Sequence, residues 1–298
     1  MWAVDMNGKA VRNIRDAFSA FHPVVNFLYF AVIIGFSMFF MHPIHLLISF
    51  ICAASYAIYL YGKKAVLVGF IFLLPMFIFA AVMNPLFNHR GATILEYLPN
   101  GNPLTLESIA FGIGAATMLI TVITWFSCVN AIMTSDKFVY LIGRFIPSLS
   151  LILSMALQFV PRFKAQIKVV SNTQKSMGKG FSVRRGIKVL SIVVTWALEN
   201  AVETADSMKS RGYGLPGRTA FSIFYFTKRD GIACAYILAN TAAIIIGVMT
   251  GSYHFRYFPT IRGSQTLWIF ACYFALGAFP LIINLKEDFI WRRIESKI

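Results

Sequence analysis

The sequence predicts an all-α integral membrane protein with about six transmembrane helices and a cytoplasmic pair of long helices. Composition predicts the membrane class: 58% of the 298 residues are hydrophobic, 13% are charged, and the mean hydropathy is +0.68. A soluble domain is nearer half apolar and a quarter charged. This shortage of charge excludes a water-soluble fold.

Six apolar segments are long enough to cross a membrane, since a spanning helix needs about 20 predominantly apolar residues, within a range of ~17–25. They are residues 24–41, 44–61, 65–83, 108–133, 232–248 and 265–285. None of the six contains Asp, Glu, Lys or Arg. An even number of spans places both termini on one side of the membrane.

The basic residues indicate which side that is. Segments 1–23, 62–64, 134–231 and 286–298 hold 24 of the 27 Lys and Arg residues, and only Arg90, Arg256 and Arg262 lie elsewhere. Basic residues favour cytoplasmic loops. We therefore expect a multi-pass protein of the cell (plasma) membrane with cytoplasmic N- and C-termini.

This orientation divides the chain into four parts. An interfacial N-terminal helix (1–23), with Val11, Ile14, Phe18 and Phe21 on one face, would lie along the inner leaflet. The other parts are transmembrane helices 1–4 (24–133), a cytoplasmic helical region (134–231), and transmembrane helices 5–6 with the C-terminal tail (232–298).

One apolar segment, residues 145–160, does not fit the six-span scheme. Arg144 and Arg162 flank it closely, and a span here would move the basic block after Arg162 to the outer face. We expect a helix that lies against the membrane or packs under other helices.

The cytoplasmic block, residues 161–230, carries 13 basic and four acidic residues, a net charge of +9. Apolar residues recur there at helical spacing and predict two amphipathic helices. The expected buried face of the first is Val160, Phe163, Ile167, Val170, Gln174 and Met177; that of the second is Ile187, Leu190, Val194, Ala197, Ala201, Ala205 and Met208. A separate acidic stripe, Glu199, Glu203 and Asp206, could pair with basic residues of the first helix.

The two predicted helices end alike, because the six residues from Lys175 (KSMGKG) match the six from Lys209 (KSRGYG) at four positions. Glycine just past the last turn commonly ends a helix, since it accepts a left-handed conformation. One interpretation is a pair of ordinary glycine caps. The other is that two equivalent helix tips enter two equivalent pockets of partner proteins, where Arg211 suits a helix C-terminus and a groove of carboxylates or carbonyls.

These residues resemble the transmembrane T component of energy-coupling-factor (ECF) type ABC transporters, in the cobalt and vitamin transport permease family. That family has a cytoplasmic pair of long coupling helices, each ending in a motif of the type Ala-Arg-Gly. The second motif here is Ser210-Arg211-Gly212, followed by YGLPGRT. The first is Ser176-Met177-Gly178, in which Met177 stands where the family has arginine. The resemblance extends to QFVPR, residues 158–162, and loosely to NPLT, residues 102–105.

The resemblance implies an energy-coupling scaffold subunit of an ATP-driven importer of a vitamin or a transition-metal ion. Its partners would be two ATP-binding cassette ATPase subunits and one membrane-embedded substrate-binding subunit. The ATPase-docking residues would be Ser210, Arg211 and Gly212 at one tip and Ser176, Met177 and Gly178 at the other, with support from Lys175, Lys179 and Lys209. The chain itself would not be an enzyme and would hold no catalytic residue, cofactor or metal.

Other functions find less support in the residues. Intramembrane charges usually mark proton relays or ion sites, and the spans lack them, but a self-contained permease or channel remains the alternative. Residues 212–219 partly match the phosphate-binding loop pattern, but Arg218 stands where that pattern requires lysine. His42, His45 and His254 lack the carboxylate or thiolate partners of a metal site, and the four cysteines lie in apolar runs. The basic block lies under the membrane, so we expect it to contact membrane lipids and no nucleic acid.

Overall fold

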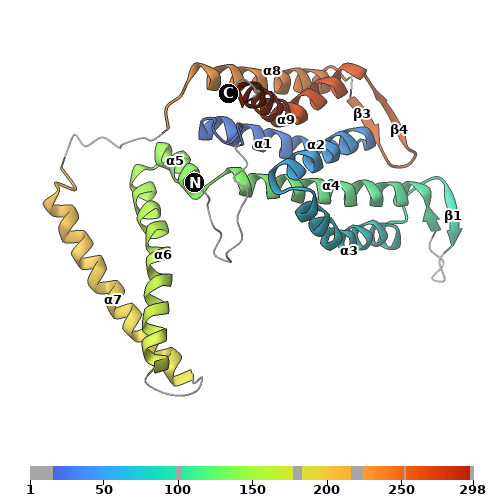
Figure 1. Cartoon of the computed structure of the whole chain (residues 1–298). Helices are drawn as coiled ribbons and strands as arrows, with labels where there is room; N and C mark the ends of the chain where they lie inside the picture. Colours follow the sequence, from blue (N-terminus) through green and yellow to red (C-terminus); the bar gives the residue numbers. More distant parts are fainter. Residues whose placement is uncertain (1–15, 98–102, 177–182, 216–223, 252, 296–298) are drawn as a thin grey trace. The chain divides into compact units, whose positions relative to one another are not determined.

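The computed structural model describes residues 16–97, 103–176, 183–215, 224–251 and 253–295. The chain forms two compact units (Figure 1). The first combines residues 1–134 with 224–298 and contains the apolar helices. The second, residues 135–223, contains the amphipathic helices. Met177, Gly178 and Lys179 lie outside the described residues, as do residues 216–219 of the imitated phosphate loop.

The first unit is a bundle of six apolar helices that correspond to the six predicted spans. Five are long and apolar enough to cross a membrane, while α1, with 17 residues, is at the short end of the usual range. The helices are α1 (Pro23–Phe39), α2 (Pro43–Tyr61), α3 (Lys63–Phe87), α4 (Leu106–Ile132), α8 (Lys228–Met249) and α9 (Leu267–Glu295). The chain is therefore a multi-pass, all-α membrane protein.

Side-chain caps fix where several of these helices begin. His22 and His42 each accept a hydrogen bond at Nδ1 from the backbone N–H two residues on, and a proline follows each of them as the first helical residue. Proline suits this position because its missing N–H would have no partner there. Thr105 caps α4 through the N–H of Ser108. His42 thus acts here as a helix cap.

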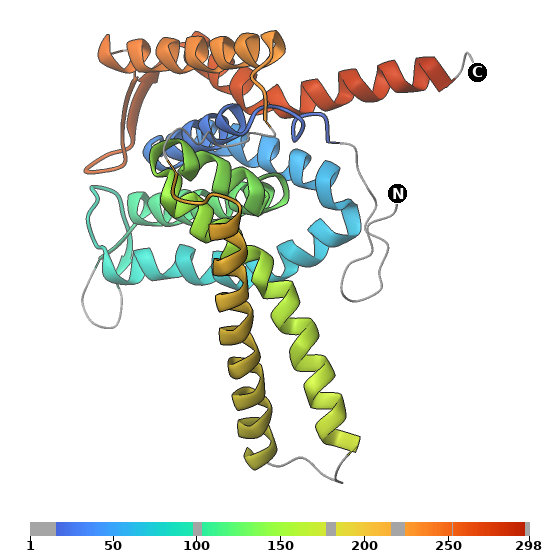
Figure 2. The same ribbon diagram turned by 90° about the vertical axis from the view of Figure 1, so that its left-hand side faces the viewer.

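The helices of the bundle form layers in which neighbours in sequence are often neighbours in space (Figures 1 and 2). Helix α3 packs on α4 and more lightly on α2, while α2 lies between α4 and α9. Helix α8 packs on α9 and α1. The C-terminal part of α9 extends beyond the other helices of the bundle (Figure 2).

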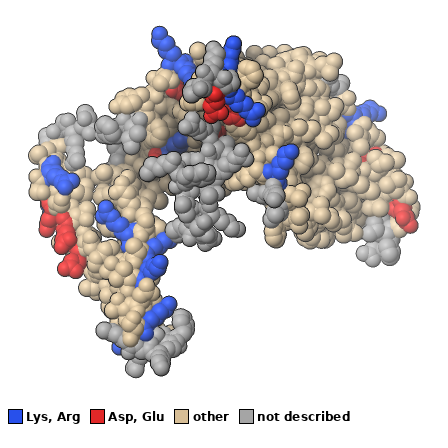
Figure 3. Space-filling view, in the orientation of Figure 1, with Lys and Arg blue, Asp and Glu red and all other residues tan. Residues whose placement is uncertain are grey.

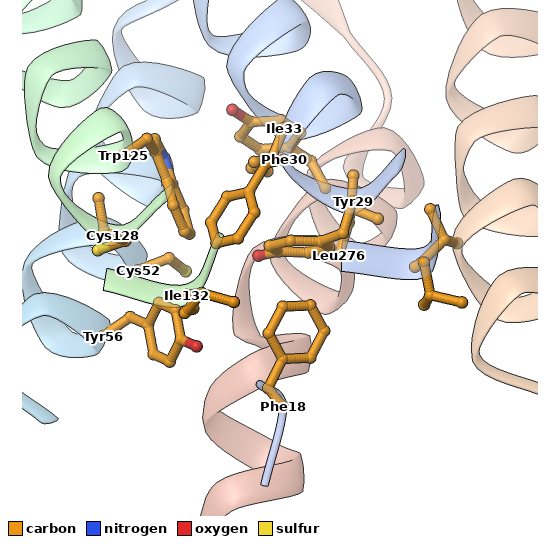
Figure 4. Close-up of a cluster of buried hydrophobic side chains, with 14 of the residues drawn as sticks. Phe18, Tyr29, Phe30, Ile33, Cys52, Tyr56, Trp125, Cys128, Ile132 and Leu276 are labelled. Carbon is orange, nitrogen blue, oxygen red and sulfur yellow. The ribbon is translucent and has the colours of Figure 1, made fainter. Parts of the chain in front are cut away.

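Aromatic rings fill the centre of the bundle (Figure 4). Phe18, Tyr29, Tyr56 and Trp125 are fully buried, and their rings contact one another at centroid distances of 5.2–6.5 Å. Such pairs add to the energy of apolar burial.

A polar network joins four of the helices nearby. The Ser37 hydroxyl lies 2.7 Å from that of Ser49 and 3.1 Å from that of Tyr273, and the indole N–H of Trp125 donates to the Ser49 oxygen. All four side chains are buried. Because hydrogen bonds in an apolar interior hold helices together, these polar groups act as structural links between α1, α2, α4 and α9.

The described part of the N-terminal segment, residues 16–22, forms a turn that is inserted into the bundle. Phe18 is buried among the rings of Tyr29, Phe30, Tyr56 and Phe279. This differs from the interfacial helix expected for residues 1–23, whose first 15 residues lie outside the described part. Phe18 and Phe21 satisfy helical spacing in the sequence, yet bundle packing holds them in a turn.

Two β-hairpins lie at the same end of the bundle. Strand β1 (Ile94–Tyr97) pairs antiparallel with β2 (Pro103–Thr105), and β3 (Tyr253–Arg256) pairs antiparallel with β4 (Arg262–Gln265). The backbone N–H of Ala92, just before β1, donates to the carbonyl oxygen of Pro259, between β3 and β4. This hydrogen bond links the two hairpins. His45, at the start of α2, is buried among Phe40, Tyr253, Phe270 and Tyr273.

The second unit contains α5 (Ser135–Phe145), α6 (Pro147–Ser176) and α7 (Val183–Ser210). Segment 145–160, expected as a separate helix that lies against the membrane or packs under other helices, is mostly the first half of α6. The 30-residue helix continues through Pro161, so the amphipathic helix expected to begin near Val160 begins 13 residues earlier. Helix α5 has no counterpart among the helices predicted from the sequence.

Candidate functional site

The candidate site is the antiparallel pair α6 and α7 (Figure 2). The rings of Phe163 on α6 and Trp196 on α7 meet edge to face, with centroids 5.8 Å apart. Val170 and Val193 are the most buried apolar residues of the two helices. Burial of these four side chains joins the helices along one seam.

The seam is rotated from the faces that the sequence predicts. On α6, Phe163, Val170 and Gln174 are at least half-buried as expected, but Val160 and Ile167 are exposed. On α7 the prediction is largely wrong, since Ile187, Leu190, Val194, Ala201 and Ala205 are exposed. The residues of α7 that turn toward α6 are Val189, Val193, Trp196, Asn200, Thr204 and Met208.

This rotation leaves an apolar stripe of α7 uncovered by the described residues of the second unit. Val183, Ile187, Leu190, Val194, Leu198 and Val202 expose between 47% and 75% of their surface. They recur at gaps of three and four residues, so they share one broad face of the helix. Large exposed apolar patches mark protein or membrane contacts.

The charges of the pair lie on separate surfaces. Arg162, Lys164, Lys168 and Lys175 are exposed on α6, and Glu199, Glu203 and Asp206 are exposed on α7. Figure 3 shows the red acidic row of α7 facing away from the blue row of α6. Among the described residues no ion pair joins the two rows, so the predicted pairing between them is absent there.

The C-terminus of α7 ends in a Schellman motif. Gly212 has a φ of +80°, its N–H donates to the carbonyl oxygen of Lys209, and the N–H of Tyr213 donates to that of Met208. These are the two hydrogen bonds that define the motif, and the left-handed residue in it is usually glycine. The side chain of Leu215 lies against Gly212, where a Cβ would come within 3.1 Å of Cδ1. Gly212 therefore stops the helix by conformation.

The stop places Arg211 at the tip as the last half-helical residue. Its side chain is exposed, and the described structure shows no partner for its guanidinium group. The neighbouring Ser210 hydroxyl donates to the carbonyl oxygen of Ser207, and Lys209 is exposed. The guanidinium thus stands where the negative end of the helix dipole favours a cation and where a partner can reach it.

A shallow groove of about 370 Å³ borders this tip. Its walls come from both helices: Met155, Phe159, Ala201, Thr204, Ala205, Met208, Lys209 and Tyr213. Phe159 and Tyr213 lie in motifs that carry the sequence resemblance, whereas no sequence pattern singles out Met155. Their meeting in one groove could not be predicted from the sequence, since they come together only when the helices pack. The two glycines around Tyr213 were the one local signal that its backbone turns back after the helix.

Of the first predicted tip, the structure describes only its beginning. Ser176 is the last residue of α6, and its hydroxyl donates to the carbonyl oxygen of Asn172. Lys175 and Ser176 are exposed. Since α6 and α7 are antiparallel, Ser176 and Ser210 lie at opposite ends of the pair.

Comparison with known proteins concerns the whole chain. No family model matches the chain. Over 194 residues the chain is 26% identical to the energy-coupling factor transporter transmembrane protein EcfT 1 of Listeria monocytogenes serotype 1/2a, covering 58% of this chain and 71% of that protein. The chain is therefore similar in sequence to EcfT proteins.

Two further EcfT proteins match over shorter stretches. The EcfT of Lactobacillus helveticus is 30% identical over 109 residues, and that of Brevibacillus brevis is 32% identical over 114. These alignments cover 34% and 36% of this chain, and 39% and 42% of the two EcfT proteins. The chain thus aligns with about two fifths of these relatives and with more of the Listeria protein.

Proposed function

We propose that this chain is the energy-coupling scaffold of an ATP-driven importer of micronutrients, either a vitamin or a transition-metal ion. The two ends of the α6–α7 pair would each dock into one cytoplasmic ATPase subunit. The apolar surface of the chain would hold a separate membrane-embedded substrate-binding subunit. In this arrangement both termini are cytoplasmic, and the ATPase subunits hydrolyse ATP.

The observation that carries the proposal is the exposed Arg211 at a helix end fixed by Gly212. A guanidinium held on a rigid backbone suits a groove lined with carboxylates or carbonyl oxygens. Helix lengths of 30 and 28 residues give each helix a span of roughly 40 Å. Docking ends that far apart favour two separate partner subunits over a single one.

The uncovered stripe of α7 supports a third partner. Its members, among them Leu190 and Leu198, are apolar, whereas the acidic row beside them is charged. A membrane-embedded subunit offers an apolar surface for such a stripe. ATP-driven movement of the two tips would then pass through α6 and α7 to the subunit packed on the stripe.

Charge reversal at the tip tests the docking role. Arg211→Glu should uncouple uptake and weaken co-purification of the ATPase subunits without affecting membrane insertion, because the exposed tip contributes little to packing. Lys164→Glu, an exposed reversal on α6 away from the tip, is the matched control. Normal uptake together with normal ATPase binding by Arg211→Glu would defeat the assignment.

Substitutions of Met177 test the first predicted tip, Ser176-Met177-Gly178. Met177→Arg should be tolerated, whereas Met177→Asp should weaken docking, because an acidic side chain is unfavourable at a helix C-terminus. Equal behaviour of the two variants would remove electrostatics from the function of this tip.

The alternative is a self-contained permease or channel. It needs a polar pathway through the bundle, but the buried hydroxyls of Ser37, Ser49 and Tyr273 are bonded to one another or to Trp125. Purified chain reconstituted in liposomes without ATPase subunits decides between the two functions. Solute movement by the lone chain would favour the alternative.

A further inference from the structure

Two arginines face each other across the β3–β4 hairpin. The register pairs Arg256 directly with Arg262, so their Cβ atoms are about 5 Å apart on the same face of the ladder. Both side chains are exposed, as is His254 on the same face. Like charges in directly opposed positions destabilise an antiparallel pair. The hairpin therefore holds two positive charges together at a cost.

The opposite face of the hairpin fixes the ladder against the bundle. The ring of Tyr253 contacts Phe40 at 4.9 Å between centroids, and the ring of Phe255 contacts His42 at 4.7 Å. Phe255 also covers Gly263, where a Cβ would overlap its ring. With these rings on the inner face, the two arginine side chains must point outward.

The connection between the strands is anchored as well. The Tyr257 hydroxyl donates a 2.8 Å hydrogen bond to the carbonyl oxygen of Met41, and Pro259 accepts one from Ala92. Burial raises the pKa of Tyr257 to about 12, so this donor keeps its proton at neutral pH. The two guanidinium groups therefore project from a backbone that is tied at both ends and at its turn.

No carboxylate neutralises the pair in the part of the chain that the structure describes. Glu107, the buried acid at this end of the bundle, accepts hydrogen bonds from the backbone and hydroxyl of Thr93. Glu96 lies on the other hairpin and is exposed. The two guanidinium groups are therefore exposed side by side, and an external anion between them would offset their repulsion.

The position of the hairpin indicates which anion is available to the two arginines. It joins α8 to α9, two helices long and apolar enough to cross a membrane. Arg256 follows the exposed Met249 by seven residues, and Arg262 precedes the exposed Leu267 by five. The hairpin packs on Phe40, Met41 and His42 at the ends of spanning helices. We therefore expect it to lie at the level of lipid headgroups, whose phosphates are abundant anions there.

We propose that Arg256 and Arg262 form a binding site for the phosphate of a membrane-lipid headgroup. Each guanidinium offers a planar fork that can donate two parallel hydrogen bonds to phosphate oxygens, and two forks together complement a tetrahedral anion. The aromatic rings beneath the ladder, Tyr253 and Phe255 among them, suit the interface, where such residues are enriched. The site depends on the fold of the bundle and not on the transport function.

The test measures lipid binding to the purified full chain by native mass spectrometry. Phosphatidylglycerol is titrated into protein stripped of lipid in a non-ionic detergent, in parallel with a phosphate-free galactolipid. The double variant Arg256→Ala/Arg262→Ala should bind phosphatidylglycerol about tenfold more weakly, as expected for the loss of charge-assisted hydrogen bonds. Arg90→Ala is the matched control, because it removes one exposed charge at the same end of the bundle.

Two comparisons make the assignment specific. The variant Arg256→Lys/Arg262→Lys keeps the charge but loses the forks, and it should bind with intermediate strength. Equal binding by the wild type and the double alanine variant would overturn the site, as would an equal loss in Arg90→Ala.

Inorganic phosphate is titrated in a separate arm. If it raises the melting temperature in the wild type alone while phosphatidylglycerol is not bound, the lipid assignment is overturned in favour of free phosphate.

Discussion

The backbone N–H of His22 donates a 2.9 Å hydrogen bond to the carboxylate of Asp230, a residue 208 positions further along the chain. The same carboxylate accepts hydrogen bonds from the backbone N–H and the hydroxyl of Thr227, completing a capping box at the start of α8. The guanidinium of Arg229 donates to the carbonyl oxygen of Ala17 and lies over a ring of the same turn. The turn before α1 is thus attached to the first residues of α8.

Asp230→Ala should therefore destabilise the bundle. It removes the acceptor of three hydrogen bonds at a buried helix start, which costs about 3 kcal/mol of the free energy of unfolding. Asp230→Asn keeps one oxygen acceptor and should cost less. Lys228→Ala, an exposed change in the same turn, should leave the melting temperature in detergent unchanged. A melting temperature of Asp230→Ala equal to that of the wild type would contradict the role of the carboxylate.

Phe18→Ala should destabilise the bundle more than any exposed aromatic substitution. The ring is fully buried and packs 5.2 Å from Tyr29 and 6.1 Å from Phe279, measured between centroids. Removing a buried phenylalanine ring costs about 3–5 kcal/mol, because a cavity remains. Phe39→Ala is the matched control, since Phe39 is 84% exposed at the end of α1. Thermal unfolding of both variants in one detergent measures the difference, and similar losses would show that the turn does not fill the core.

The pH dependence of the protein's stability should reflect protonation of the Asp16 carboxyl. Burial raises the pKa of this carboxyl above 3.8, although the hydroxyl of Tyr56 and the N–H of Phe18 donate to it. The folded state therefore holds a proton that the unfolded chain has lost, so this group's contribution to stability falls as the pH rises from 3.8 through the raised pKa. Asp16→Asn should flatten the melting temperature over that interval. An unchanged pH profile in the variant would exclude Asp16 as the source.

The transmembrane helices could be predicted from sequence because a spanning helix must be apolar along its whole length. The predicted spans and the observed helices agree to within a few residues at most ends, and the histidine–proline pairs mark two of the starts. The turn around Phe18 could not be predicted in this way. Its apolar residues fit a helical period, and only packing against Tyr29 and Tyr56 from other helices shows that they belong in the core.

The candidate site was likewise predictable only in part. The glycine stop at Gly212 was predictable, since the conformation of one residue decides it. The seam of α7 was not, because apolar residues occupy two neighbouring stripes of this helix. Val193 lies on one and Leu190 on the other. Periodicity alone does not tell which stripe packs on α6 and which stays exposed.

Gly212→Ala should weaken the tip although it adds only one methyl group. A residue with a Cβ is strained at a φ of +80°, and the added methyl would press on Leu215, so a cost of about 1 kcal/mol is expected at the end of α7. Gly186→Ala, in the first turns of the same helix with open space around it, should instead stabilise α7 by about 0.5–1 kcal/mol. Hydrogen exchange of residues 205–213 measures the effect. Equal protection in the two variants would argue against a conformational role of Gly212.

Serine substitutions on the two stripes of α7 should separate packing within the chain from packing between chains. Val193 is 2% exposed, so Val193→Ser should lower the stability of the α6–α7 pair by about 2 kcal/mol through lost apolar contact and a buried hydroxyl. Leu190 is 63% exposed, so Leu190→Ser should change the stability of the isolated chain by less than about 0.5 kcal/mol. In the assembly that we propose, the order should reverse for binding. Leu190→Ser would then weaken co-purification of the membrane-embedded subunit because it places a hydroxyl in the apolar contact. A Leu190→Ser chain that retains that subunit fully would show that the exposed stripe faces lipid.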